Sequence, residues 1–271
     1  MDFDAYLARF GGERTGHPSL EALEKLIRAH VSSIPFENFD VIDRTPIVLD
    51  VSRIYAKIVA NRRGGFCYEL NSLFETLLRH LDYDVRLLSA RVRNSTTKIL
   101  GPVNDHVILS VALPRARSER YLVDVAFADA VAAPMPFVSG TERTHALWDV
   151  RLRETAGETA AHWRVETRAS AGHEWIERYR FTLDVVDCLD RFADTLRYHQ
   201  TDPRAPFMIA RVCSLLRKDE GRVVFTDRGD DGPRLIVTEP NREIERRVTY
   251  LRSSDKIEQA LLANFGIQVS L

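Results

Sequence analysis

The chain has 271 residues, 45% of them hydrophobic, and its 38 basic and 39 acidic side chains leave a formal net charge of −1. A hydrophobic fraction of this size can form a core, which excludes a wholly disordered chain, and the length suggests about two domains. The balanced charge lacks the basic excess of nucleic-acid and anionic-membrane binders, and no apolar run approaches the ~20 residues of a membrane span.

The first eighty or so residues have the apolar spacing of helices. Apolar residues three or four apart define one helix between Phe3 and Phe10, and a second after the turn at Pro18-Ser19. Asp50 is a candidate cap of a third helix. The strongest helical pattern follows the glycine pair Gly64-Gly65 and begins at or near Cys67.

Beyond Tyr83 the pattern changes to short β-branched or aromatic segments separated by Gly, Pro, Asn or Ser. They predict an antiparallel sheet or barrel over Val85–Val92, His106–Leu113, Arg120–Phe127, Trp163–Thr167 and Trp175–Leu183. The remainder is predicted as a helix over Val185–Tyr198, a helix over Phe207–Leu216, strands near Val223–Phe225 and Leu235–Thr238, and a last helix around Ile257–Phe265. We therefore expect three units: 1–83, 84–184 and 185–271.

The acidic, amphipathic start of the chain lacks the basic-then-apolar order of a signal peptide. Three cysteines are too few and too scattered for a disulfide framework or a four-thiolate zinc site. We therefore expect a cytoplasmic protein without a metal, and neither a nucleic acid nor a membrane as partner. The polar run 226–232 lacks the spacing of a calcium loop, and a hairpin turn is the preferred interpretation.

Cys67 is the best candidate nucleophile because it sits at a predicted helix N-terminus behind two glycines. The helix dipole and the unpaired N–H groups there stabilise a thiolate and could polarise a thioester or amide oxygen. Cys188 and Cys213 lie in apolar helical patterns, where a buried, inert thiol is the default. The alternative interpretation of Cys67 is that it too is a buried, unreactive thiol that only packs in the core.

A cysteine nucleophile needs a base, and the base needs an orienting partner. Of the eight histidines, His106 opens an apolar strand and would be held rigidly, whereas His30 and His80 are predicted on helix surfaces. Asp124 interrupts an apolar strand, where a carboxylate is costly to bury unless an imidazolium or hydrogen bonds satisfy it. The alternative for Asp124 is an edge-strand carboxylate that faces solvent.

Several motifs, taken in order, resemble the arylamine N-acetyltransferase family. They are Tyr6–Gly11, Pro18–Leu23, Ile34–Phe39, Arg63–Asn71, Ala90–Val92 and the strands of His106 and Asp124. The resemblance covers most of the first ~140 residues, because the predicted helices and strands follow the family's order over that length. The rest of the chain matches only in length and element order.

The resemblance implies an α+β fold with a papain-like cysteine-protease-type core, made of an N-terminal helical bundle, an antiparallel β-barrel and a C-terminal α/β lid. The triad that it implies is Cys67, His106 and Asp124. The acceptor pocket that it implies is lined by Phe36, Val92 and Phe127. The implied reaction is ping-pong: Cys67 takes an acetyl group from acetyl-CoA, CoA leaves, and an aromatic amine or hydrazine attacks the thioester.

The chain departs from the family after its aspartate, where Ala126, Ala128 and Asp129 stand in a usually glycine-rich run. Methyl groups and a carboxylate beside a polyanion are expected to weaken CoA binding or redirect donor choice. The same triad also suits an amide synthase that closes a macrolactam from a carrier-bound acyl chain, or a cysteine hydrolase or transglutaminase-like enzyme. A non-enzymatic relic is the remaining alternative, which the intact triad disfavours.

Overall fold

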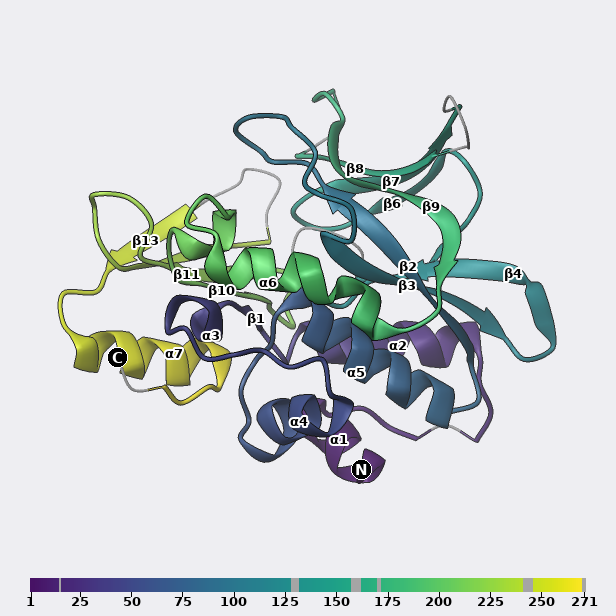
Figure 1. The fold of residues 1–271 in the computed structure, drawn as a ribbon, viewed down its shortest axis with the longest axis horizontal. Coiled ribbons are helices and arrows are strands. Elements are labelled where there is room, and N and C mark those ends of the chain that lie inside the picture. The colour runs from purple at the N-terminus through teal and green to yellow at the C-terminus, as the bar shows by residue number, and fades with distance from the viewer. Residues whose placement is uncertain (15, 128–131, 157–161, 170–171, 241–245, 270–271) are drawn as a thin grey trace.

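A computed structural model describes residues 1–14, 16–127, 132–156, 162–169, 172–240 and 246–269 (Figure 1). The N-terminal part is helical, with α1 (Phe3–Phe10), α2 (Leu20–Val31), α3 (Phe39–Ile42), α4 (Val51–Tyr55), which continues into a π-helical turn at Ala56–Ala60, and α5 (Cys67–His80). Asp2, Ser19 and Asp50 each accept a backbone N–H from the residue three positions on, which caps α1, α2 and α4.

An antiparallel sheet of eight strands follows and curls into a nearly closed barrel. Its strands are β2 (Asp84–Val92), β3 (His106–Leu113), β4 (Ala116–Val123), β5 (Met135–Pro136), β6 (Thr141–Thr144), β7 (Asp149–Thr155), β8 (His162–Arg168) and β9 (Ile176–Val186). In the sheet their order is β5-β4-β3-β2-β9-β8-β7-β6, so β2 pairs with β3 on one side and with β9 on the other.

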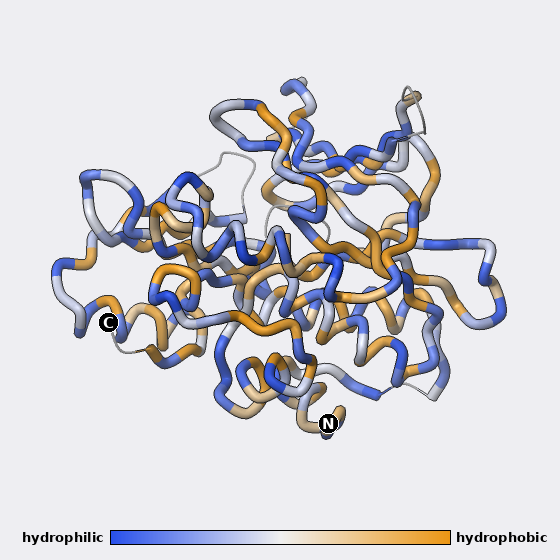
Figure 2. Tube along the Cα trace, viewed as in Figure 1, coloured by the Kyte–Doolittle hydropathy of each residue, from blue (hydrophilic) through white to orange (hydrophobic). Residues whose placement is uncertain are grey.

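Strand β3 is buried on both faces because α5 packs on one face and the barrel interior covers the other. Val107, Leu109 and Val111 join the core that contains Leu70, whereas Ile108 joins the barrel core. Successive side chains of a strand point to opposite faces, so alternate residues of β3 pack into two different cores. In Figure 2 the hydrophobic colour gathers along the middle of the molecule, where these elements meet. Helix α5 and strand β3 thus form one rigid unit.

The C-terminal part combines helices with a second antiparallel sheet. It contains a 3-10 turn (Leu189–Phe192), α6 (Ala193–Thr201), a second 3-10 turn (Pro206–Met208), β10 (Val212–Leu216), β11 (Arg222–Thr226), β12 (Arg234–Thr238), β13 (Arg246–Tyr250) and α7 (Ser254–Phe265). The short strand β1 (Phe36–Glu37), from the helical part, pairs with β10 at the edge of this sheet. The division at 83/84 and 184/185 stays a prediction, since β1 joins the C-terminal sheet and β9 continues to Val186.

The structure corrects two helix predictions. Residues 207–216 were predicted helical, but only a 3-10 turn follows Pro206, and Val212–Leu216 form β10 between β1 and β11. A short apolar run cannot distinguish a helix from a buried strand, and here backbone pairing on both sides decides for the strand. Likewise β9 extends through Val186, and the helix predicted from Val185 begins only at Ala193.

Three side chains also differ from their predicted settings. Cys188 is exposed at the start of a 3-10 turn rather than buried in a helix. His30 is buried rather than on a surface, and its Nε2 is hydrogen-bonded to the Tyr6 hydroxyl at 2.8 Å. Strand β4 ends at Val123, so Asp124 comes directly after the strand and not within it.

One further prediction agrees with the structure. Residues 226–232 connect β11 to β12 as a hairpin turn. Within the part of the chain that the structure describes, no helix combines the length and the apolar character needed to cross a bilayer.

Candidate active site

Cys67 is the first residue of α5, and the segment before it is fixed to β1. The N–H of Gly65 donates to the carbonyl of Pro35, and the Gly65 carbonyl accepts from the N–H of Glu37. A Cβ on Gly64 would lie 2.4 Å from the Pro35 carbonyl oxygen, so this close approach requires glycine. The predicted helix start at Cys67 is confirmed, and the glycine pair is what brings the helix N-terminus against β1.

A buried group of charges holds the same helix N-terminus. The Glu69 carboxylate accepts the N–H of Phe66 at 2.8 Å, and Lys57 Nζ lies 2.7 Å from the same carboxylate oxygen. Lys57 also pairs with Asp40 at 2.7 Å, and Arg63 donates to Glu37 at 2.8 Å. Burial favours the neutral form of Lys57, but these carboxylates outweigh it and raise the pKa of its ammonium group. Lys57 therefore stays charged, and its contact with Glu69 fixes the first turn of α5.

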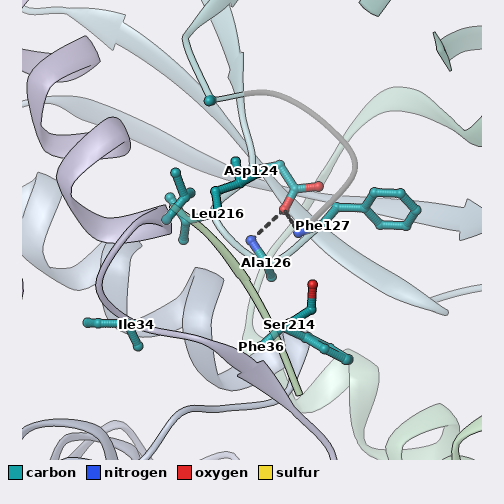
Figure 3. A pocket seen from close by; sticks show the side chains of 10 residues that line it. Ile34, Phe36, Asp124, Ala126, Phe127, Ser214 and Leu216 are labelled. Atoms are coloured by element: carbon teal, nitrogen blue, oxygen red, sulfur yellow. Dashed lines mark hydrogen bonds between the residues drawn. The ribbon is translucent and has the colours of Figure 1, made fainter. Parts of the chain in front are cut away.

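His106, at the start of β3, points its Nε2 to Asp124 Oδ2 at 2.8 Å, and both side chains are buried. The other oxygen of Asp124 accepts from Asn71 Nδ2 at 2.9 Å and from the N–H groups of Ala126 and Phe127 at 3.0 and 3.2 Å. Figure 3 shows these two backbone hydrogen bonds, with the Asp124 carboxylate turned toward the chain that follows it. A solvent-facing Asp124 is therefore excluded.

The hydrogen bonds of Asp124 also set its charge. Burial by itself would raise the pKa of this carboxyl, but the charge of His106 and the hydrogen bonds from His106, Asn71 and Ala126 outweigh burial and lower the pKa. Asp124 is therefore a carboxylate at neutral pH. Since a carboxylate only accepts hydrogen bonds, His106 Nε2 must carry the proton and Nδ1 is left for another partner.

Sequence reasoning gave no role to Asn71 or to Tyr179. Asn71 lies four residues after Cys67, on the same face of α5, and it also donates to the Val107 carbonyl and accepts the N–H of Val125. The Tyr179 ring on β9 is buried, with its centroid 5.5 Å from that of His106 and 5.2 Å from that of Phe127. The spacing of Asn71 from Cys67 was readable from the sequence, whereas the approach of Tyr179 depends on the pairing of β2 with β9.

At the Cys67 thiol, the backbone of the helix N-terminus favours the thiolate, whereas burial and neighbouring carboxylates oppose it. Burial raises the pKa of the Cys67 thiol, the negative charges of Asp105 and Asp124 raise it further, and the N–H of Tyr68 lowers it by less. The thiol therefore keeps its proton until a base takes it. His106 lines the same cavity as Cys67 and is placed to be that base.

The cavity in front of Cys67 has a volume of about 170 Å³ and a mostly apolar wall. The polar residues that line it are Cys67, Asp105, His106, Ser214 and Arg222. The apolar lining residues are Phe36, Val92, Ala126, Phe127, Phe207 and Val212, a set that holds all three predicted pocket residues. Phe207, from the 3-10 turn after α6, was not predicted. Of the three unusual residues after Asp124, Ala126 is buried and its N–H donates to Asp124, whereas Ala128 and Asp129 lie outside the described residues.

A larger cavity of about 540 Å³ adjoins this one, and Val92, Asp105, Phe127 and Phe207 line both. Its wall carries the guanidinium groups of Arg93, Arg178, Arg204 and Arg228. Asp105 is its acidic lining residue. The described residues hold no group of three or more His, Cys, Asp or Glu side chains suited to a metal ion. The chemistry of the site is thus that of a cysteine, an imidazole and a carboxylate beside a basic cavity.

Comparison with known proteins identifies relatives of the whole chain. A family model described as N-acetyltransferase matches residues 19–271. An arylamine N-acetyltransferase of Mycolicibacterium smegmatis is 33% identical over 81% of this chain and 78% of its own length. A pineal gland isozyme of arylamine N-acetyltransferase from Gallus gallus is 30% identical over 100% of this chain and 92% of its own length.

Solved structures agree with these matches. The arylamine N-acetyltransferase of Mycobacterium marinum in complex with CoA has a TM-score of 0.84 at 27% identity, covering 98% of this chain and 93% of that one. The enzyme from Bacillus cereus, described with a Cys-His-Glu catalytic triad, has a TM-score of 0.83 at 26% identity, covering 99% and 100%.

Replacing Asp124 with asparagine tests the charge that orients His106. Asp124→Asn keeps the shape but presents an amide to Nε2, which favours the wrong imidazole tautomer, so we expect acyl transfer to fall by about 10³–10⁴. Because the pKa of Asp124 is lowered on folding, its ionisation stabilises the fold at neutral pH, and this part is lost as the pH falls below about 4. The stability deficit of the variant should therefore shrink in acid.

The measurement is urea unfolding of both proteins between pH 7 and pH 3, together with the rate of acetyl transfer. Asp194→Asn on α6 is the matched control, because its carboxylate is exposed and, among the residues that the structure describes, pairs with Arg197 on the same helix. A deficit for Asp124→Asn that stays constant down to pH 3 would show that the Asp124 charge does not stabilise the fold.

Proposed function

This chain belongs to the arylamine N-acetyltransferase family, and we propose that it transfers an acetyl group from acetyl-CoA to an aromatic amine or hydrazine through a thioester on Cys67. The observation that carries the proposal is the buried contact between Asp124 and His106, because His106 also lines the cavity that contains Cys67. The two relatives described above are named arylamine N-acetyltransferases, and their matches cover 81% and 100% of this chain.

In the first half-reaction His106 Nδ1 takes the proton of the Cys67 thiol, since Nε2 is committed to Asp124. The thiolate attacks the thioester carbonyl of acetyl-CoA, and the tetrahedral intermediate breaks its bond to the CoA sulfur. His106 returns the proton to that sulfur. N–H groups in the first turn of α5 lie beside Cys67 and favour negative charge there.

In the second half-reaction the amine nitrogen attacks the acetyl carbon held on Cys67. His106 accepts the proton that the nitrogen loses, and the Cys67 sulfur leaves and recovers a proton. An aromatic amine is a poor nucleophile, so its position beside the thioester in an apolar cavity is what favours the transfer. The rings of Phe36, Phe127 and Phe207 supply that apolar wall and match a flat aromatic acceptor.

The basic cavity supports CoA as the carrier of the acetyl group. CoA is a polyanion, and guanidinium groups pair well with phosphate oxygens. The four arginines of this cavity come from the barrel (Arg93 and Arg178) and from the C-terminal part (Arg204 and Arg228). In this proposal the three units at 1–83, 84–184 and 185–271 have separate roles: the first supplies Cys67, the second supplies His106 and Asp124, and the third closes the cavity over the donor.

Mass spectrometry after incubation with acetyl-CoA, without an acceptor, tests the nucleophile. We expect one acetyl group per chain, mapped to the peptide of Cys67, and its release when an aniline is added. Cys188→Ser and Cys213→Ser are the matched controls and should acetylate like the wild type, whereas Cys67→Ser should not. An acetyl group on either of the other cysteines, or none at all, would refute the assignment.

Charge-neutralising variants of the basic cavity test the donor. We expect Arg204→Gln and Arg228→Gln each to raise the KM for acetyl-CoA by about 3- to 10-fold, because a partly exposed guanidinium–phosphate contact is worth roughly 1 kcal/mol. The KM for acetyl-pantetheine, which lacks the nucleotide, should not change. Arg197→Gln is the control, since Arg197 lies on α6 outside this lining. An equal rise in KM for acetyl-CoA and acetyl-pantetheine would mean that these arginines do not bind the phosphates of CoA.

A further inference from the structure

A second imidazole and carboxylate meet beside the proposed triad. His199 on α6 places its Nε2 2.9 Å from Asp105 Oδ1, and both side chains are at least nine-tenths buried. The two atoms are close enough for an ion pair, but the orientation of the ring does not give the angles that a hydrogen bond requires. The mechanism above does not use this pair.

Asp105 is held in place from the barrel side. Its other oxygen, Oδ2, accepts the N–H of Val92 at 3.0 Å, and its backbone carbonyl accepts the Tyr68 hydroxyl at 3.0 Å. A Cβ on Gly101 would lie 2.1 Å from Oδ2, so the chain opposite leaves room for this carboxylate only because it has glycine there. The position of Asp105 is thus determined independently of His199.

His199 is held in place from the nucleophile side. Its ring centroid lies 5.8 Å from that of Phe66 and 6.4 Å from that of Tyr68, the two residues that flank Cys67. A third ring, of Phe207, lies at 5.4 Å. The contact between His199 and Asp105 therefore lies between the first turn of α5 and the start of β3, which carry the nucleophile and the base.

The charge of Asp105 acts on Cys67. Asp105 lines the cavity of Cys67, and after burial its negative charge is the largest influence that opposes ionisation of the thiol. In a site of low polarity such a charge is weakly screened. Among the described residues, His199 is the basic side chain found within ion-pair distance of Asp105, and its ring is a cation when both nitrogens carry a proton. An uncompensated Asp105 would therefore work against the nucleophile.

We propose that Asp105 and His199 form a second carboxylate–imidazolium pair that keeps the charge beside Cys67 balanced and so allows its thiolate to form. His199 is a positioning residue in this proposal, because it acts on Cys67 through Asp105 and touches no reacting atom. The inference rests on Cys67 being the nucleophile of the proposed function.

The other acidic or phenolic groups around Cys67 are already compensated or neutral. The cavity is also lined by one arginine, Arg222, whose guanidinium donates to Ser214 Oγ at 3.3 Å. On its own helix, Glu69 is paired with Lys57. From the barrel, Asp124 is paired with His106, and the pKa of the buried Tyr179 is raised by burial and by Asp124, so its phenol stays neutral. Beside Cys67, burial raises the pKa of Tyr68 and keeps that phenol neutral as well. The Asp105 pair is thus the remaining variable in the charge balance.

The test is the pH dependence of Cys67 alkylation by iodoacetamide, mapped by peptide mass, in the wild type, His199→Gln, Asp105→Asn and the double variant. His199→Gln should move the inflection to higher pH by about half to one unit, because Asp105 is left uncompensated. Asp105→Asn should move it to lower pH. In the presence of Asp105→Asn, the further change His199→Gln should no longer move the inflection upward.

His80→Gln is the matched control, since His80 lies at the exposed end of the same helix as Cys67 and should leave the inflection unchanged. An equal upward shift by His199→Gln with and without Asp105→Asn would overturn the proposal, because the effect would then not pass through the carboxylate. Should His199→Gln fail to fold, His199→Asn replaces it in the same comparison, and an inflection that does not move upward in that variant refutes the proposal. Alkylation needs no acetyl donor, so failure here is distinct from failure of Cys67 to acetylate.

Discussion

The buried carboxylate of Asp124 is the constraint on which the site depends. Its oxygens bind four groups from three separate segments: Asn71 on α5, His106 on β3, and the backbone that follows β4. A buried charge is costly unless its hydrogen-bonding capacity is filled, so these segments must meet in one arrangement for the fold to be stable. The same arrangement fixes the tautomer of His106 and sets it beside the helix that begins at Cys67. The contacts that stabilise the fold around Asp124 are therefore the same contacts that position the site before a substrate binds.

The apolar cavity has two opposite effects on the chemistry of Cys67. Exclusion of water protects a thioester and strengthens electrostatic interactions, but it also disfavours the thiolate. Each carboxylate near Cys67 has a basic side chain beside it that can offset its charge: Lys57 for Glu69, His106 for Asp124 and His199 for Asp105. The nucleophile thus depends on charges contributed by the helical part, the barrel and α6 together.

Much of this site could be predicted from the sequence because its signals are local. Gly64-Gly65 before a helical pattern predicted the start of α5, and an acidic residue within an apolar strand pattern identified Asp124 as a group that needs a partner, although the strand itself ends at Val123. The settings of His199, Tyr179 and Phe207 could not be predicted, because each depends on contacts between distant segments: α6 against α5, β9 against β2, and the 3-10 turn against the cavity. The misassigned helix at 207–216 has the same origin, since pairing with β1 and β11 overrides a short ambiguous pattern.

The most direct test of the account is the protonation of the two ring nitrogens of His106, measured by ¹⁵N NMR of labelled imidazoles and assigned with a His106→Gln variant. The account predicts that Nε2 keeps its proton when His106 is neutral, because the Asp124 carboxylate accepts it, and that Nδ1 is then the bare nitrogen that faces the cavity of Cys67. In Asp124→Asn this preference should be lost. A neutral His106 in the wild-type protein with its proton on Nδ1 would contradict the account, because no base would then be available to take the proton of Cys67.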